Sequence, residues 1–183
     1  NVGLPERQMG NSEVGHLNLG AGRIVYQDLA KINLAVQNKN VNQEKPLIDA
    51  FKYALENNKK VHFLGLVSNG GVHSHTSHLY GLLDAAKEYG LEKIFVHAFT
   101  DGRDVDPKSA LLDIANLEEY VKDSNAKIAT VIGRYYAMDR DKRWERVKLA
   151  YDLLVNSIGD HTTNFVESIQ KSYDENVTDE FIQ

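Results

Sequence analysis

Three short segments of the chain combine histidine, aspartate and arginine at close spacing: residues 68–75 (SNGGVHSH), 100–104 (TDGRD) and 133–140 (GRYYAMDR). The planar guanidinium group of arginine can pair with two oxygens of a phosphate or carboxylate at once. Histidine can hold a proton near neutral pH. These residue types therefore predict a site for a small ligand with phosphate or carboxylate groups. The candidate residues are His73, His75, Asp101, Arg103, Asp104, Arg134 and Arg140.

The overall charge limits the class of partner. The formal net charge is −5, which argues against a nucleic-acid partner, because binding a polymer of phosphates needs a broad basic surface. An acidic chain with a local group of arginines suits a small anion better. The sequence contains no cysteine, which excludes disulfides and thiolate metal sites. No apolar run approaches the roughly 20 residues that span a bilayer, so we expect a soluble, cytoplasmic protein without a membrane partner.

An apolar run directly precedes each polar segment. The runs at 61–67, 94–99 and 128–132 predict buried strands. Between them, apolar residues recur at helical spacing over 79–86 and 110–121. Strands that alternate with helices of this length predict a three-layer α/β/α fold with a mainly parallel sheet. Because the carboxyl ends of parallel strands meet at one edge of a sheet, the polar segments should face one cleft.

Local signals also predict where several helices begin and end. Pro46 fits the first turn of a helix, and Gly90 can end the helix before it. Asp106 and Pro107 predict the N-cap and first turn of the next helix. A further helix is predicted over 144–154.

Simpler interpretations compete with the ligand site. The spacing of His73, His75 and His78 would also suit a metal site, although no carboxylate accompanies it locally. The turn at 101–104 could serve only to cap the next helix. Other residues are expected in structural or solvent-exposed positions: His78 on the exposed side of its helix, Arg143 and Arg146 in solvent, and His62 and His97 half-buried in strands.

A serine near the start of the chain lies in a glycine-rich segment. Ser12 stands between Gly10 and Gly15. It could be the N-cap of a short helix. Alternatively, it could be a nucleophile at a helix N-terminus, where free amides and the helix dipole stabilise a phosphate. No base or metal ligand is obvious beside it, so a nucleophilic Ser12 needs activating groups from outside this chain.

Long motifs resemble the cofactor-independent (2,3-bisphosphoglycerate-independent) phosphoglycerate mutases. Residues 8–16 (QMGNSEVGH) and 20–27 (GAGRIVYQ) are similar to the nucleophile region of that family. The substrate-domain motifs follow in the family's order, at 70–75 (GGVHSH), 97–104 (HAFTDGRD) and 133–146 (GRYYAMDRDKRWER). Asn69 is a departure, because the family often has aspartate there.

The resemblance implies a glycolytic isomerase that interconverts 3-phosphoglycerate and 2-phosphoglycerate through a phosphoserine, without 2,3-bisphosphoglycerate. Ser12 matches the nucleophile, which in the family also ligates one of two divalent metals, usually manganese. In the family, arginines hold the carboxylate and phosphate of the substrate, while an aspartate and a histidine contact its hydroxyls. The matching positions here are His73, Arg103, Asp104, Arg134 and Arg140.

The resemblance also implies a domain organisation. Family members join a metal-bearing domain of the alkaline phosphatase type, split in sequence, to an inserted phosphotransferase domain. Residues 1–26 match the end of the first half of the former, and residues 27–183 match most of the latter. The other metal ligands fall outside the chain, so the isolated chain is expected to be inactive. The full-length protein is expected to be monomeric. The alternatives are a phosphatase or phosphopentomutase relative, and a non-catalytic phosphate-binding module.

Overall fold

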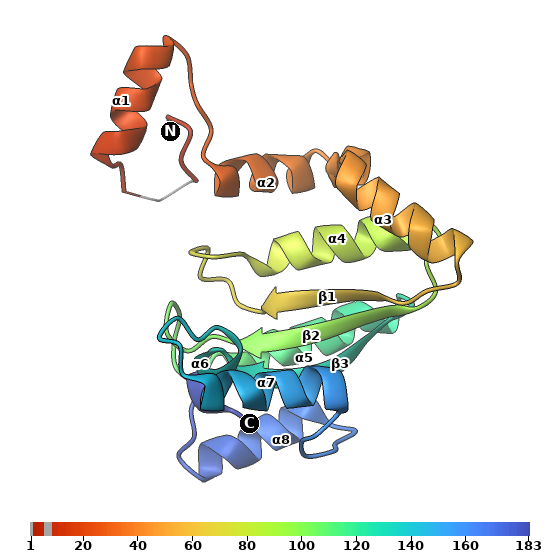
Figure 1. Cartoon of the computed structure of the whole chain (residues 1–183). Coiled ribbons are helices and arrows are strands. Elements are labelled where there is room, and N and C mark those ends of the chain that lie inside the picture. Colours follow the sequence, from red (N-terminus) through yellow and green to blue (C-terminus); the bar gives the residue numbers. More distant parts are fainter. Residues whose placement is uncertain (1, 6–8) are drawn as a thin grey trace.

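The computed structural model describes residues 2–5 and 9–183, which form an α/β fold with short 3₁₀ helices (η) (Figure 1). In chain order its elements are α1 (Ser12–Ala21), α2 (Asp28–Gln37), η1 (Val41–Gln43), α3 (Lys45–Glu56), β1 (Val61–Leu66), α4 (Thr76–Glu88), β2 (Ile94–Thr100), α5 (Ala110–Lys122), β3 (Ala126–Gly133), α6 (Arg134–Ala137), α7 (Trp144–Asn156), α8 (Phe165–Asp174) and η2 (Asp179–Phe181). Gln8, which belongs to the motif that resembles the nucleophile region, lies outside the described residues.

The sheet has three parallel strands in the order β1-β2-β3. Ile94 lies opposite both Val61 and Ala126 in the register. Successive crossovers in one direction put α4 and α5 on the same face of the sheet, and α6 and α7 pack on the other face (Figure 1). The predicted α/β/α class and parallel sheet are confirmed.

The two faces of the sheet are covered unequally. The larger core joins α3, α4, α5 and α8 to one face, around residues such as Leu83, Ile94 and Ile114. On the other face, a smaller core at the carboxyl ends of the strands contains Leu66, Phe99, Ile132, Tyr136 and Ala150.

The structure corrects the predicted burial of β1, His62 and His97. β2 is buried on both faces, as expected, but in β1 the side chain of Leu64 is 56% exposed and His62 is also exposed. His97 is buried instead of half-buried, and its ring nitrogens contact His62 (2.8 Å) and Thr130 (2.9 Å) across the sheet. Leu64 and His62 are exposed because β1 is an edge strand that the helices cover on one face only near these residues. The apolar run of β1 does not indicate which face the helices leave open.

Helix boundaries agree with the local signals in two of three cases. Pro46 lies in the first turn of α3, and Gly90, with φ +85°, follows the end of α4. The prediction of a helix start at Asp106 and Pro107 is wrong, because α5 begins at Ala110. The carboxylate of Asp106 accepts a hydrogen bond from the backbone of Lys108 and so closes a separate turn.

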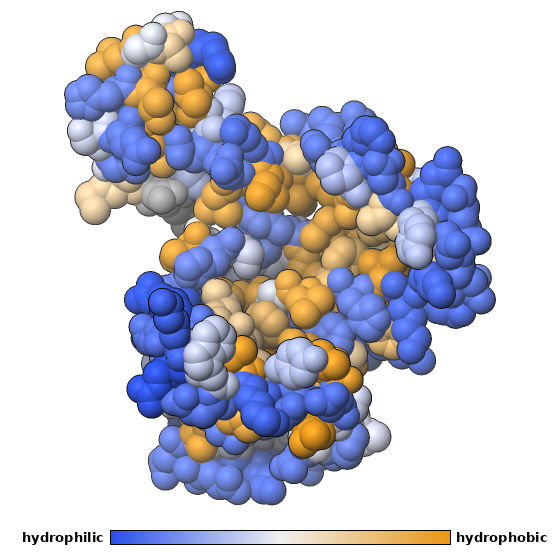
Figure 2. Space-filling model, in the orientation of Figure 1, coloured by the Kyte–Doolittle hydropathy of each residue, from blue (hydrophilic) through white to orange (hydrophobic). Residues whose placement is uncertain are grey.

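The N-terminal arm is a small unit of its own. The side chain of Asn18 in α1 accepts a hydrogen bond from the Val25 amide and donates one to the Val2 carbonyl, while the Gln27 amide donates to the Gly3 carbonyl. α1 lies away from the sheet (Figure 1), and apolar side chains gather on its surface (Figure 2). None of the helices within 2–5 and 9–183 is sufficiently long and apolar to cross a bilayer.

Candidate functional site

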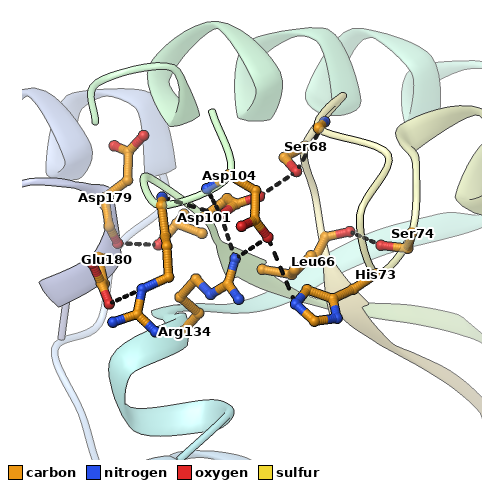
Figure 3. A network of polar contacts seen from close by, with 12 residues as sticks. Leu66, Ser68, His73, Ser74, Asp101, Asp104, Arg134, Asp179 and Glu180 are labelled. Carbon is orange, nitrogen blue, oxygen red and sulfur yellow. Dashed lines mark hydrogen bonds and ion pairs between the residues drawn. The ribbon is translucent and has the colours of Figure 1, made fainter. Parts of the chain in front are cut away.

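The turns that follow the three strands meet at one edge of the sheet. His73 follows β1, Asp104 follows β2, and Arg134 is the first residue of α6, directly after β3. Arg134 donates a hydrogen bond from Nη1 to Oδ2 of Asp104 at 2.6 Å, and the same oxygen lies 3.6 Å from Nε2 of His73 (Figure 3). The parallel sheet thus brings these side chains together, as the sequence predicts.

Arg134 is buried between two carboxylates. Its side chain is 8% exposed, and Nη1 lies 2.6 Å from both Asp101 Oδ1 and Asp104 Oδ2. Burial by itself would lower the pKa of the guanidinium, but the hydrogen bonds to Asp104 and Asp101 raise it. A buried guanidinium needs such partners because an unpaired charge in the interior is strongly destabilising. Arg134 is therefore held charged and in one orientation.

Asp101 organises its own turn. Its carboxylate accepts hydrogen bonds from Ser68 Oγ (2.7 Å) and from the backbone N–H groups of Arg103 (3.2 Å) and Asp104 (3.0 Å). Burial would raise the pKa of Asp101, yet these bonds and the one from Arg134 lower it overall. Gly102 completes the turn with φ +68°, a conformation that glycine adopts readily. The interpretation of this turn as a cap for the next helix is wrong, since α5 starts six residues beyond it.

The lowered pKa of Asp101 predicts a pH dependence of stability. A carboxyl group whose pKa is lower in the folded state stabilises the fold above its unfolded pKa, about 3.9, and this contribution is lost as the pH falls through the folded pKa. We expect the Asp101→Asn variant to be less stable at neutral pH and to lose less stability than the wild type between about pH 5 and pH 3.

Urea denaturation at a series of pH values measures this difference. Asp160→Asn, which changes an exposed aspartate, is the control and should retain the wild-type pH dependence. Equal pH dependence of stability in Asp101→Asn and wild type would contradict the lowered pKa of Asp101 in the folded state.

The other arginines lie differently. The side chain of Arg103 is 52% exposed, and its Nε is 3.3 Å from Oε1 of Glu180. Arg140 is exposed, and within the described residues no ion pair ties it to the cluster. Contacts therefore unite His73, Asp101, Asp104 and Arg134, with Arg103 joined through its backbone, and they leave Arg140 at the surface.

The histidines after β1 divide between two roles. His75 caps α4, because its Nδ1 accepts a hydrogen bond from the Ser77 amide at 3.1 Å. His78 is buried, and its Nε2 lies 2.5 Å from the side-chain oxygen of Asn33 in α2, so the prediction of an exposed His78 is wrong. Burial, with a smaller effect of His75, lowers the pKa of His78. No group of three potential metal ligands occurs among the described side chains, which leaves the metal interpretation of these histidines without support.

The two arginines at the start of α7, Arg143 at the N-cap and Arg146 in the first turn, also differ from each other. Arg143 is exposed, as expected, and its side chain pairs with Glu145. Arg146 is only 19% exposed: its guanidinium carbon lies 3.8 Å from the ring centroid of Tyr135, and its Nη1 is 3.5 Å from Asp139. The prediction of a solvent-exposed Arg146 is wrong because the aromatic ring on α6 covers it.

Ser12 is the first residue of α1, and the N-cap is Asn11, whose side chain accepts a hydrogen bond from the Val14 amide at 2.9 Å. The N-cap interpretation of Ser12 is therefore wrong. Nδ1 of His16 lies 3.1 Å from the Ser12 hydroxyl and 2.7 Å from the Ser12 carbonyl oxygen. The contact with the Ser12 carbonyl requires the tautomer that has a proton on Nδ1, and in that tautomer Nδ1 is not a base for the hydroxyl. Ser12 is exposed on α1, away from the cluster at the sheet edge (Figure 1).

Sequence reasoning missed two acidic residues beside the cluster, Asp179 and Glu180. They belong to η2, which lies against the ends of β2 and β3. The sequence offers one indirect signal for them, since arginines near a buried site need carboxylates, and acids elsewhere in the chain are the candidates.

Ligands of open α/β sheets bind beyond the carboxyl ends of the strands, so the cluster lies where this class of fold places a ligand site. The chain belongs to the family described as "BPG-independent PGAM N-terminus", whose model matches residues 32–183.

Similar proteins agree with this assignment. The 2,3-bisphosphoglycerate-independent phosphoglycerate mutases of Flavobacterium johnsoniae and Bacteroides fragilis are 72% and 62% identical to the chain over 183 residues, which is the whole chain and 36% of each relative. A crystal structure of Leishmania mexicana phosphoglycerate mutase, determined at low cobalt concentration, matches with a TM-score of 0.84 and 32% identity. The match covers 99% of this chain and 35% of the Leishmania chain. The chain thus spans about a third of the length of these mutases.

Proposed function

We propose that this chain is the part of a 2,3-bisphosphoglycerate-independent phosphoglycerate mutase that holds the substrate and supplies the nucleophile. Residues 27–183 would form the substrate-binding domain, and residues 1–26 would belong to the split metal-bearing domain. The observation that carries the proposal is the contact of Arg134 and His73 with the same oxygen of Asp104, from three successive strand ends. The similarity to mutases along the whole chain supports the choice of substrate.

The charges of the cluster indicate how a phosphoglycerate would be bound. Arg103 and Arg134 are paired with three carboxylates, those of Asp101, Asp104 and Glu180. This network alone therefore does not attract an anion. Additional positive charge would come from the exposed Arg140. In this proposal the arginines hold the phosphate and carboxylate of the substrate, and Asp104 and His73 contact its hydroxyls and transfer a proton.

This proposal predicts which arginines determine affinity. Arg103→Ala and Arg140→Ala should each weaken the binding of 3-phosphoglycerate to the isolated chain about tenfold or more, because a hydrogen bond to a charged group contributes about 1.5–3 kcal/mol. The affinity should also fall with salt, since both side chains are solvent-accessible. Chemical-shift titration measures the affinity.

Arg143→Ala is the matched control for these two variants. Arg143 is also exposed but is paired with Glu145, and its replacement should leave the affinity unchanged. If millimolar 3-phosphoglycerate shifts no resonance of Arg103, Arg134 or Arg140, the proposed substrate site is wrong.

The described residues do not make up a metal site. They contain no group of three metal-ligating side chains, and the Ser12 hydroxyl supplies a single oxygen. In the proposed function, the two divalent ions, manganese by the family resemblance, take their other ligands from a part of the longer protein that lies outside this chain. Ser12 would be the residue of this chain that accepts the phosphoryl group.

A chimeric enzyme tests the proposed function. The matching 183 residues of the Flavobacterium johnsoniae mutase are replaced by this chain. The chimera should interconvert 3-phosphoglycerate and 2-phosphoglycerate without added 2,3-bisphosphoglycerate. A folded chimera without turnover would contradict the proposal.

We also propose that the whole protein is a cytoplasmic monomer, and light scattering of the purified protein tests its mass.

A further inference from the structure

Residues 178–182, which we call the C-terminal clip, lie against the ends of two strands of the site. Thr100, the last residue of β2, donates a hydrogen bond from Oγ1 to the Asp179 carbonyl at 2.6 Å. Gly133, the last residue of β3, donates from its amide to the Ile182 carbonyl at 2.7 Å. The clip therefore joins the strands that precede the 101–104 turn and α6.

Asp179 anchors the clip in the protein interior. The residue is fully buried, and its Oδ2 accepts a hydrogen bond from the Ala110 amide, the first of α5, at 2.9 Å. Its Oδ1 accepts a hydrogen bond from the Tyr173 hydroxyl of α8. These bonds fix the backbone of the clip, and with it the position of the next residue, Glu180.

Two glycines of the site motifs leave room for the clip. A Cβ atom on Gly133 would lie 2.3 Å from the Glu180 carbonyl oxygen, and one on Gly102 would lie 2.8 Å from Cβ of Asp179. Cβ atoms essentially never lie so close to another heavy atom, so a side chain at either position would force its surroundings to shift. The clip, whose backbone passes directly against the two motifs, thus leaves no room for a side chain at either position, and at Gly102 this adds to the requirement of its positive φ.

Glu180 faces Arg103 from this fixed backbone. Its side chain is 16% exposed, and Oε1 lies 3.3 Å from Nε of Arg103. In Figure 3, Glu180 and His73 lie on opposite sides of Arg134. The contact at Nε leaves the Nη1 and Nη2 edge of the Arg103 guanidinium, which can bind two oxygens of a carboxylate or phosphate.

We propose that Glu180 is a positioning residue that orients Arg103 toward the anionic substrate. This inference rests on the proposed function, because it assumes that Arg103 binds the phosphoglycerate. Without Glu180, the half-exposed Arg103 side chain would sample several rotamers, and binding would have to select one of them. Asp179 bonds to the first amide of α5, whereas Glu180 contacts Arg103. The two neighbouring acids of the clip therefore have different roles, which mutation can separate.

A double-mutant cycle in the chimera tests the inference. Glu180→Ala should raise KM for 3-phosphoglycerate about three- to tenfold in the presence of Arg103, with a smaller change in kcat. In the Arg103→Ala background, Glu180→Ala should have no further effect on KM. A role confined to folding would raise KM equally in both backgrounds. An equal effect, or an unchanged KM, would overturn the inference.

Two further measurements keep the result interpretable. Glu175→Gln removes an exposed negative charge at the end of α8 and should leave KM unchanged. In the isolated chain without ligand, Glu180→Gln should shift the Nε–H resonance of Arg103, and an unchanged resonance would also overturn the inference. Absence of turnover in the chimera with wild-type residues would instead count against the proposed function, while the resonance would still report on the Glu180 contact.

Discussion

Replacing Arg134 by methionine should lower the free energy of unfolding by about 3–5 kcal/mol, because removal of one partner leaves buried charge without compensation. Asp101 is 2% exposed, and Arg134 Nη1 is its cationic partner at 2.6 Å. Such a loss is a large part of the 5–15 kcal/mol that typically stabilises a domain. Urea denaturation of the isolated chain at neutral pH measures it.

Two comparisons separate charge from packing in this experiment. Arg143→Met removes an exposed arginine and should change the stability by less than about 1 kcal/mol. Combining Arg134→Met with Asp101→Asn and Asp104→Asn should recover part of the loss, since the uncompensated charges are then absent. A loss below about 1 kcal/mol in the single variant would mean that solvent, rather than Arg134, compensates the two carboxylates.

Ser12→Ala should reduce turnover of the chimera by at least about 10,000-fold, because loss of a covalent nucleophile removes the reaction path itself. The isolated chain should show no measurable mutase activity, because in the proposed function Ser12 is activated by two metal ions whose other ligands lie outside this chain. A coupled assay that detects 2-phosphoglycerate measures both.

The controls for Ser12 test whether the effect is chemical. Ser168→Ala changes an exposed serine of α8 and should retain full turnover. Ser12→Ala should not alter the binding of 3-phosphoglycerate to the isolated chain, because α1 is separate from the cluster at the sheet edge (Figure 1). Activity of the Ser12→Ala chimera within tenfold of the original would refute the role of Ser12 as the nucleophile. Turnover by the contaminant-free isolated chain would refute the expected need for groups outside this chain.

Local sequence patterns were sufficient for the strands and for the meeting of His73, Asp104 and Arg134. Apolar runs mark strands, and once strands alternate with helices the sheet is parallel, so the turns that follow the strands share one edge. No long-range information is needed for that step. The same logic explains why Pro46 and Gly90 indicate helix ends correctly.

The remaining features depend on contacts between distant parts of the chain. α5 begins at Ala110 because Asp179, 69 residues further along, accepts the hydrogen bond of its first amide. Arg146 is covered by Tyr135 of another helix, and Leu64 is exposed because the helices leave part of one sheet face open. The contact between Glu180 and Arg103 depends on the position of the clip, which lies beside the 101–104 turn although it is far away in the sequence. A local pattern specifies none of these neighbours.

The double pairing of Arg134 has a consequence for the thermodynamics of ligand binding. Ordering a long, flexible side chain at a binding site typically costs about 0.5–1.5 kcal/mol of conformational entropy. Arg134 loses this freedom when the protein folds, since the carboxylates of Asp101 and Asp104 hold its Nη1. An arriving anion would therefore restrict mainly the exposed Arg140, and the entropy change of binding should be sensitive to that side chain far more than to Arg134.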